Sequence, residues 1–229
     1  MLKKAVLIIH GFAGGTYDQE DLANYLELSR KYDVFQFTLP GHKRNLSKSK
    51  YNDWINASEE KIEWLKDNGY HTIYLIGHSM GGVIATYIAS KHKEVKKLVL
   101  AAPAFHYLSV DDSKKSITKS INEIPSIIKT YGKEEVIARV LKLNISTVKE
   151  FTSLVAKYYN TPKKVKCNTL LLQGTKDKLV PKSSVEYVYN NLAGKHKKII
   201  YIEGATHDIF RGDNALDTFK IVKKFFDRW

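Results

Sequence analysis

Residues 75–82 read "LIGHSMGG" and place Ser79 between glycines, directly after a run of apolar residues. The pattern predicts a strand over Thr72–Gly77 and a helix over Gly81–His92. Residues 77–81 match G-x-S-x-G, in which a sharp turn between a strand and a helix exposes the serine hydroxyl. A non-glycine residue held in such a strained turn is usually functional. The stretch therefore makes Ser79 the candidate nucleophile.

Short β-rich runs alternate with helical patterns along the rest of the chain. This alternation predicts crossover connections and a mostly parallel sheet, so the expected fold class is α/β. The expected strands are Lys4–His10, Val34–Leu39, Thr72–Gly77, Lys97–Ala102, Thr169–Gln173 and Lys198–Ile202. The expected helices are Asp18–Lys31, Asp53–Asn68, Gly81–His92, Ser183–Leu192 and Leu216–Arg228.

The connection over residues 103–168 is far longer than an ordinary loop. Apolar residues recur in it at helical spacing: Ile117, Ile121, Ile124, Ile128, Val136, Val140, Leu143, Val148, Phe151 and Val155. We expect residues 104–162 to form a helical cap inserted into a core of residues 1–103 and 163–229. A separate second domain is the alternative, although so short a segment rarely supports its own core. Gly132 and Pro162 are candidate bounds of cap segments that shift when substrate enters.

Length and composition favour one sizeable core, because 43% of the 229 residues are hydrophobic. The only cysteine, Cys167, cannot form an internal disulfide, so a reducing cytoplasm is the expected location. The apolar run Ala5–Ile9 is shorter than the core of a signal peptide. No stretch approaches the ~20 apolar residues of a membrane span.

The formal net charge of +13 raises the question of an anionic partner. Only five of the 37 basic residues are arginine, the side chain best suited to phosphates and guanine edges, and no nucleic-acid-binding motif is present. We therefore expect no nucleic acid as a partner. A solvated lysine-rich surface is the first interpretation, and weak association with an anionic membrane surface or an anionic substrate is the alternative.

A serine nucleophile needs a base, and the chain offers eight histidines. His207, in "EGATHDIF" (203–210), follows the last expected strand and so lies at the same sheet edge as Ser79. The other seven are less suitable. His10 and His78 sit beside glycine turns with other tasks, His71, His92 and His196 are expected on the surface, and His42 and His106 either line the site or are ordinary loop residues.

The base must in turn be oriented by an acid. Asp177, in "LLQGTKDKLVP" (171–181), lies on the loop after the expected strand Thr169–Gln173, again at the carboxyl edge. Asp208 and Asp213 are close to His207 in the sequence, but neighbouring side chains on one loop seldom face each other. Asp177 is therefore the candidate acid.

A glycine-rich segment, "HGFAGG" (10–15), follows the first expected strand. Its glycines let backbone N–H groups approach a substrate oxygen. The amides of Phe12 and Met80 would then form an oxyanion hole. A phosphate-binding loop is the rival interpretation, but the chain contains neither G-x-x-x-x-G-K-[ST] nor G-x-G-x-x-G.

Five stretches together resemble the α/β-hydrolase family, and specifically its small carboxylesterases and monoacylglycerol lipases. They are "VLIIHGFAGG" (6–15), "LPGH" (39–42), "LIGHSMGG" (75–82), "LLQGTKDKLVP" (171–181) and "GATHDIF" (204–210). The order Ser, Asp, His along the chain is also that of this family. The resemblance implies a serine hydrolase without cofactor or metal that acts through an acyl-enzyme. It further implies six parallel strands in the order 2-1-3-4-5-6, without the two antiparallel strands that often open this fold.

Apolar side chains are expected beside the nucleophile. Phe12, Met80 and Phe105, with Gly11 and His78, are the candidate substrate-binding residues. Such a pocket fits short- to medium-chain esters or monoacylglycerols. A thioesterase or amidase could use the same residues, and a C–C hydrolase, a haloperoxidase or a non-catalytic ligand-binding receptor are further alternatives. The sequence leaves the oligomeric state open.

Overall fold

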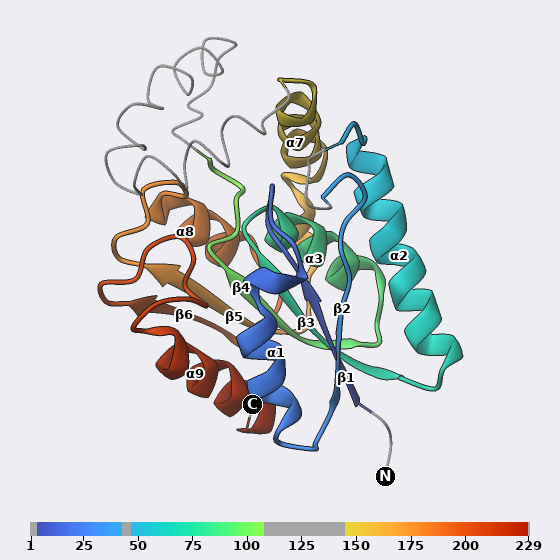
Figure 1. The fold of residues 1–229 in the computed structure, drawn as a ribbon, viewed down its shortest axis with the longest axis vertical. Helices are drawn as coiled ribbons and strands as arrows, with labels where there is room; N and C mark the ends of the chain where they lie inside the picture. Colours follow the sequence, from blue (N-terminus) through green and yellow to red (C-terminus); the bar gives the residue numbers. More distant parts are fainter. Residues whose placement is uncertain (1–3, 43–46, 108–144, 229) are drawn as a thin grey trace.

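The computed structural model describes residues 4–42, 47–107 and 145–228. Its centre is a six-stranded sheet in the order β2-β1-β3-β4-β5-β6, in which every neighbouring pair is parallel (Figure 1). The strands are β1 (Lys4–Ile9), β2 (Asp33–Gln36), β3 (Thr72–His78), β4 (Val95–Ala101), β5 (Asn168–Gly174) and β6 (Lys197–Ile202). The α/β class and the expected strand order are confirmed, and the described residues contain no antiparallel pair.

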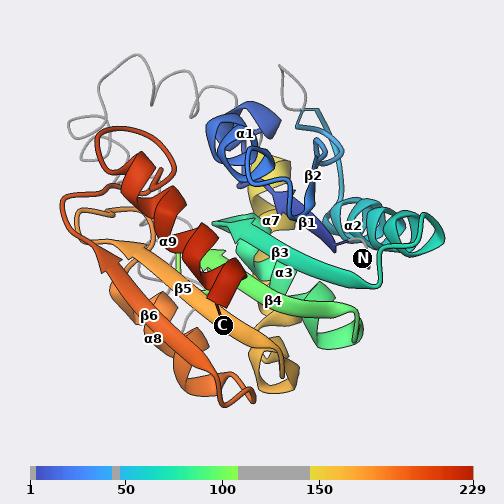
Figure 2. The same ribbon diagram turned by 90° about the horizontal axis from the view of Figure 1, so that it is seen from below.

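Helices cover both faces of the sheet (Figures 1 and 2). Helices α1 (Glu20–Glu27) and α9 (Ala215–Arg228) lie on one face. The other face carries α2 (Tyr51–Asp67), α3 (Met80–Lys91), α7 (Ile145–Tyr158) and α8 (Lys182–Asn191). Two short 3₁₀ turns, η1 (Thr16–Asp18) and η2 (Thr161–Lys164), complete the described elements.

Strand β1 shows why the sheet forms at this place. Its residues from Ala5 onward are buried, because alternate side chains enter the two hydrophobic cores on opposite faces. Burial of each large aliphatic side chain contributes about 1.5–3 kcal/mol. The carboxyl ends of parallel strands share one edge, so the loops after β1, β3, β5 and β6 meet there.

Two of the element boundaries that differ from the expected ones are explained by hydrogen bonds. The first helix begins at Glu20 rather than Asp18, because the Asp18 carboxylate accepts the Gly15 N–H at 3.0 Å and closes the 3₁₀ turn η1. Strand β2 ends at Gln36 rather than Leu39, since the Leu39 N–H donates to His10 Nε2 at 2.9 Å instead of to a sheet partner.

One lysine lies inside the fold. Lys97 on β4 is only 8% exposed, and its ammonium group donates to the carbonyl oxygens of Phe225 and Phe226 at 3.0 and 2.8 Å. These carbonyls belong to the last turn of α9, where a helix has acceptors without intrahelical donors. Burial lowers the pKa of Lys97.

The long excursion after β4 is described only in part. Val148, Phe151 and Val155 lie on helix α7, and Pro162 is buried in η2. The periodic residues from Ile117 to Leu143, and Gly132, lie outside the described residues. Over the parts of the chain that the structure describes, no helix combines the length and the apolar character needed to cross a bilayer.

Candidate active site

The turn between β3 and α3 holds Ser79 in a strained conformation. Its φ is 54° and its ψ is −119°, a region that non-glycine residues rarely occupy. The Ser79 N–H donates to the Ala101 carbonyl at 2.9 Å, and the Ser79 carbonyl accepts the N–H groups of Gly82 and Ala104 at 2.9 and 3.1 Å. Backbone hydrogen bonds on both sides therefore hold the predicted nucleophile turn.

Gly77 and Gly81 have to be glycines because backbone atoms of other residues lie close to them. A Cβ atom on Gly81 would overlap the carbonyl oxygen of Ile9, and one on Gly77 would overlap that of Gly81. A Cβ on Gly11 would lie 3.1 Å from the Cβ of Ser79. The loop after β1 therefore packs directly against the nucleophile.

His207 and Asp177 form the predicted pair. His207 Nδ1 lies 2.8 Å from Asp177 Oδ2, and the two side chains are 6% and 0% exposed. Gln173 Nε2 also donates to Oδ2 at 3.0 Å, while the N–H groups of Leu179 and Val180 donate to Oδ1 at 2.8 and 2.9 Å. Because the carboxylate accepts the Nδ1 proton, His207 keeps Nε2 as its basic nitrogen.

The acid is ionised despite its burial. Desolvation alone would raise the pKa of Asp177, but the His207 charge and hydrogen bond, with the Val180 and Leu179 N–H groups, outweigh it and lower the pKa. A carboxylate in this position stabilises the imidazolium that forms when His207 accepts a proton.

The residue before the nucleophile connects the two halves of the site. His78 Nε2 donates to the His207 carbonyl at 3.0 Å, and the two rings lie 4.9 Å apart. Burial lowers the pKa of His78, so the ring is neutral at pH 7 and carries its proton on Nε2. The loops that carry Ser79 and His207 are thus joined by a hydrogen bond.

The loop after β1 has the form expected of an oxyanion hole. The Gly14 N–H donates to the Gly11 carbonyl at 3.2 Å and closes a turn in which Ala13 has a φ of 57°. Within the described ranges, the N–H groups of Phe12 and Met80 have no hydrogen-bond acceptor. Met80 is also the first residue of α3, where unpaired N–H groups and the helix dipole attract negative charge.

Two further histidines lie behind this loop. His10 Nδ1 donates to the Gly11 carbonyl at 2.8 Å, and burial lowers the pKa of His10 to about 4. His42 Nδ1 donates to the Pro40 carbonyl at 3.0 Å, and its ring meets the Phe12 ring edge-on at 5.8 Å. Neither histidine is a base for Ser79, but His42 contacts the site through Phe12.

His106 lies farther out, in a cluster of tyrosines. Its Nε2 is 2.9 Å from the Tyr159 hydroxyl, and its ring is 5.2 Å from that of Tyr187. Burial lowers the pKa of His106. These contacts give His106 a packing role between the start of the excursion and helix α8.

The expected substrate-binding side chains divide into two groups. Phe12 is partly exposed, whereas His78, Met80 and Phe105 are 5%, 0% and 2% exposed. The side chains of Met80 and Phe105 thus pack inside the protein, whereas His78 also borders the recess described below. The substrate-binding role of these three side chains stays a prediction, and Met80 also has a candidate role through its backbone N–H.

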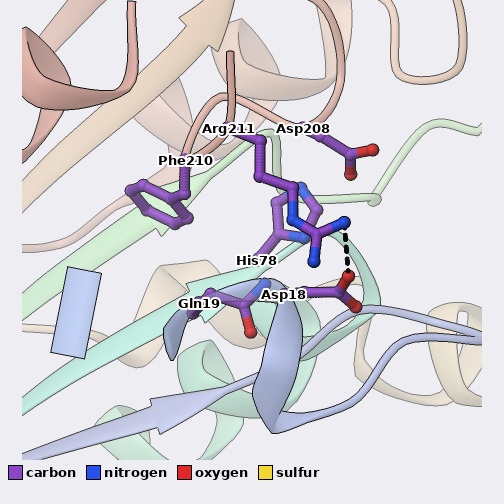
Figure 3. Close-up of a pocket in the computed structure, with 6 residues that line it drawn as sticks. All are labelled: Asp18, Gln19, His78, Asp208, Phe210 and Arg211. Atoms are coloured by element: carbon purple, nitrogen blue, oxygen red, sulfur yellow. Dashed lines mark ion pairs between the residues drawn. The ribbon is translucent and has the colours of Figure 1, made fainter. Parts of the chain in front are cut away.

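A small recess, lined mainly by residues with polar side chains, lies beside His78 (Figure 3). Arg211 crosses it from the His207 loop, donates to the Tyr17 carbonyl at 3.0 Å and pairs with Asp18 at 3.4 Å. Asp208 also borders this recess, whereas the partner of His207 Nδ1 is Asp177. Sequence reasoning did not find this second link between the loops after β1 and β6.

Glu59, Glu63 and His92 form the one group in the described parts of the chain with the residue types and spacing of a metal site. His92 Nε2 lies 2.6 Å from Glu59 Oε2, and Lys91 and Lys66 pair with Glu59 and Glu63 at 2.8 and 2.7 Å. Since each carboxylate already has a lysine partner, the group is an ion-pair network. His92, expected on the surface, is only 10% exposed in its side chain.

Known proteins resemble this chain in sequence and in fold. The model of the Hydrolase_4 family, described as serine aminopeptidase S33, matches residues 2–214. The chain is 23% identical over 208 residues to a thermostable monoacylglycerol lipase of Bacillus sp. (strain H-257), covering 88% of this chain and 82% of the relative. It is 26% identical over 216 residues to a carboxylesterase of Bacillus subtilis (strain 168), covering 90% and 85%. A solved structure from work on LipS and LipT, two metagenome-derived lipolytic enzymes, shares the fold with a TM-score of 0.77 at 17% identity, over 99% of this chain and 94% of that one.

Proposed function

The chain belongs to the Hydrolase_4 (serine aminopeptidase, S33) family, and from that premise we propose that it is a serine hydrolase that cleaves carboxylic esters. The observation that carries the proposal is the strained Ser79 turn, tied through His78 to the loop of a buried His207–Asp177 pair. The relatives named carboxylesterase and monoacylglycerol lipase support the ester class.

The reaction follows from the roles of these groups. His207 Nε2 accepts the Ser79 hydroxyl proton while the oxygen attacks the ester carbonyl, and Asp177 stabilises the resulting imidazolium. The N–H groups of Phe12 and Met80 bind the oxyanion of the tetrahedral intermediate. His207 then protonates the leaving alcohol, and a water molecule activated by the same nitrogen hydrolyses the acyl-enzyme.

The acyl group is short to medium in length, as in simple esters or monoacylglycerols. The apolar ring of Phe12 beside the oxyanion loop, and the absence of a charged side chain among Gly11, Phe12 and Met80, support an uncharged acyl group. An amide or thioester is the second candidate, and the family description as an aminopeptidase favours the amide of the two.

The test is a panel of p-nitrophenyl esters from acetate to palmitate, with matched thioester and anilide substrates and Ser79→Ala as control. We expect ester hydrolysis with one preferred chain length and no activity in the control. Faster turnover of the matched anilide would favour the amidase. Tight binding without repeated turnover would favour a receptor.

The remaining assignments extend the proposal. Residues 104–162 form a cap over the site, and helix α7, which packs on α2 and α3, supports this. The protein acts in the cytoplasm, in keeping with its single cysteine, whose pKa burial raises to about 11. The lysine-rich surface associates weakly with anionic membranes, and co-sedimentation with phosphatidylglycerol vesicles at low and high salt tests this.

A further inference from the structure

An aromatic contact joins helix α7 to the oxyanion loop. The rings of Phe151 and Phe12 stack with centroids 5.3 Å apart and an interplanar angle of 18°. Phe151 is 3% exposed, and the Tyr107 ring also packs on it, in a T-shaped arrangement with centroids 5.3 Å apart. The face of the Phe12 ring therefore contacts helix α7, which lies outside the sheet and the loops that follow its strands.

The other contacts of the Phe12 ring come from the core. His42 and Trp54 meet it edge-on at 5.8 and 6.3 Å. Both are fixed in turn, because His42 Nδ1 and Trp54 Nε1 donate to the Pro40 carbonyl at 3.0 Å each. These two rings are steeply inclined to the Phe12 ring, at 79° and 70°, whereas the Phe151 ring lies nearly parallel to it and supplies the stacking contact.

Helix α7 is itself anchored near this contact. The Glu150 carboxylate accepts the N–H of Tyr51, the first residue of α2, at 3.0 Å. A carboxylate at a helix N-terminus is favoured both by the unpaired N–H groups and by the helix dipole. The neighbouring residue, Phe151, is thereby held at a fixed place above the oxyanion loop.

We propose that Phe151 is a positioning residue that holds the Phe12 side chain, and with it the Phe12 N–H, in place for the oxyanion. The inference rests on the proposed function, in which the Phe12 N–H is one of two oxyanion donors. The Phe12 amide lies in the turn closed by the Gly14 N–H and the Gly11 carbonyl, so a shift of the side chain that carries the Phe12 Cα with it also moves the donor. Correct placement of helix α7 is thereby coupled to the chemical step.

The test compares Phe151→Leu with Tyr158→Leu. Tyr158 lies on the same helix and packs on Tyr87 of α3 with ring centroids 4.5 Å apart, so its substitution also removes an aromatic contact of α7 with the core. Phe151→Met serves if the leucine variant does not fold. Steady-state kinetics are measured with p-nitrophenyl acetate, butyrate and octanoate.

An aromatic pair contributes an amount of free energy that corresponds to about a ten-fold change in rate. We therefore expect Phe151→Leu to lower kcat/KM about ten-fold, through kcat, and by the same factor for all three esters. Tyr158→Leu should stay within about two-fold of the wild-type protein. A loss that grows with acyl length would make Phe151 a wall of the acyl pocket and would overturn the proposal, as would an equal loss in Tyr158→Leu.

Hydrogen exchange tests the coupling without activity. The Gly14 and Gly15 amides are protected by the Gly11 carbonyl and the Asp18 carboxylate. They should exchange faster in Phe151→Leu than in Tyr158→Leu or the wild-type protein. Unchanged exchange overturns the positioning role, whether or not the protein hydrolyses esters. If the wild-type protein hydrolyses none of the esters but exchange is faster in Phe151→Leu, the positioning role is supported and only the proposed function is rejected.

Discussion

Replacing Asp177 with asparagine reverses a single hydrogen bond at the base. The new amide oxygen stays on the Leu179 and Val180 N–H groups, which donate to Oδ1 at 2.8 and 2.9 Å. The amide NH₂ then replaces Oδ2, 2.8 Å from His207 Nδ1, and donates where the carboxylate accepted. His207 Nδ1 must become an acceptor, so the proton moves to Nε2, which can no longer take the Ser79 proton.

The expected fall in kcat is about 10⁴-fold, the size seen when a triad acid is made neutral at constant shape. At 1.36 kcal/mol per factor of ten, this corresponds to about 5.4 kcal/mol of barrier. The NH₂ group also meets Gln173 Nε2, a second donor 3.0 Å from Oδ2, so the fold should lose about 1–3 kcal/mol.

Turnover of p-nitrophenyl butyrate and urea unfolding measure the two effects separately. Asp208→Asn is the matched control, because Asp208 is the neighbouring carboxylate that borders the recess of Figure 3. It should keep most of the wild-type kcat. An Asp177→Asn protein with more than about a tenth of the wild-type kcat, or an inactive Asp208→Asn protein, would refute the reasoning.

Three other outcomes concern stability, each measured by urea unfolding. Burial lowers the pKa of His10 from 6.5 to about 4, so between these pH values the unfolded chain binds a proton that the folded chain does not. Stability should fall by about 3 kcal/mol as the pH drops through this window, and His10→Gln should show a correspondingly shallower loss. Lys97→Met should lower the free energy of unfolding by about 1–3 kcal/mol, because it leaves two α9 carbonyls unpaired. Lys96→Met, at the exposed neighbouring position, should lower it by less than about 0.5 kcal/mol. Gly81→Ala should destabilise by about 3 kcal/mol, and equal stability would show that the backbone can move away from the new Cβ.

The fold, the strained turn at Ser79 and the pairing of Asp177 with His207 were predictable because their signals are local. Glycines at the Ser79 turn and apolar runs of strand length mark the elements, and the common carboxyl edge of parallel strands then brings separate loops together. This reasoning was sufficient to pair Asp177 with His207, which lie on the loops after β5 and β6.

Contacts between distant segments left no such signal. The bond from His78 to the His207 carbonyl joins residues 129 positions apart, and the Phe12–Phe151 stack joins the first loop to α7. Burial can be inferred from an apolar pattern, but the identity of the partner cannot. The ion pair between His92 and Glu59 left no signal for the same reason, because the two residues are 33 positions apart.

The hydrogen bond from His78 to the His207 carbonyl also limits how parts of this chain can be exchanged with those of relatives. A loop from a relative that replaces residues 203–211 brings its own histidine. That histidine is held correctly only if the side chain of residue 78 donates a hydrogen bond to its carbonyl, as His78 does here. The turn at 77–81 and the loop at 203–211 therefore form one unit of recombination. Chimeras that exchange both segments together should retain a working histidine base. Libraries that randomise position 78 alone will mainly contain proteins in which His207 is misplaced.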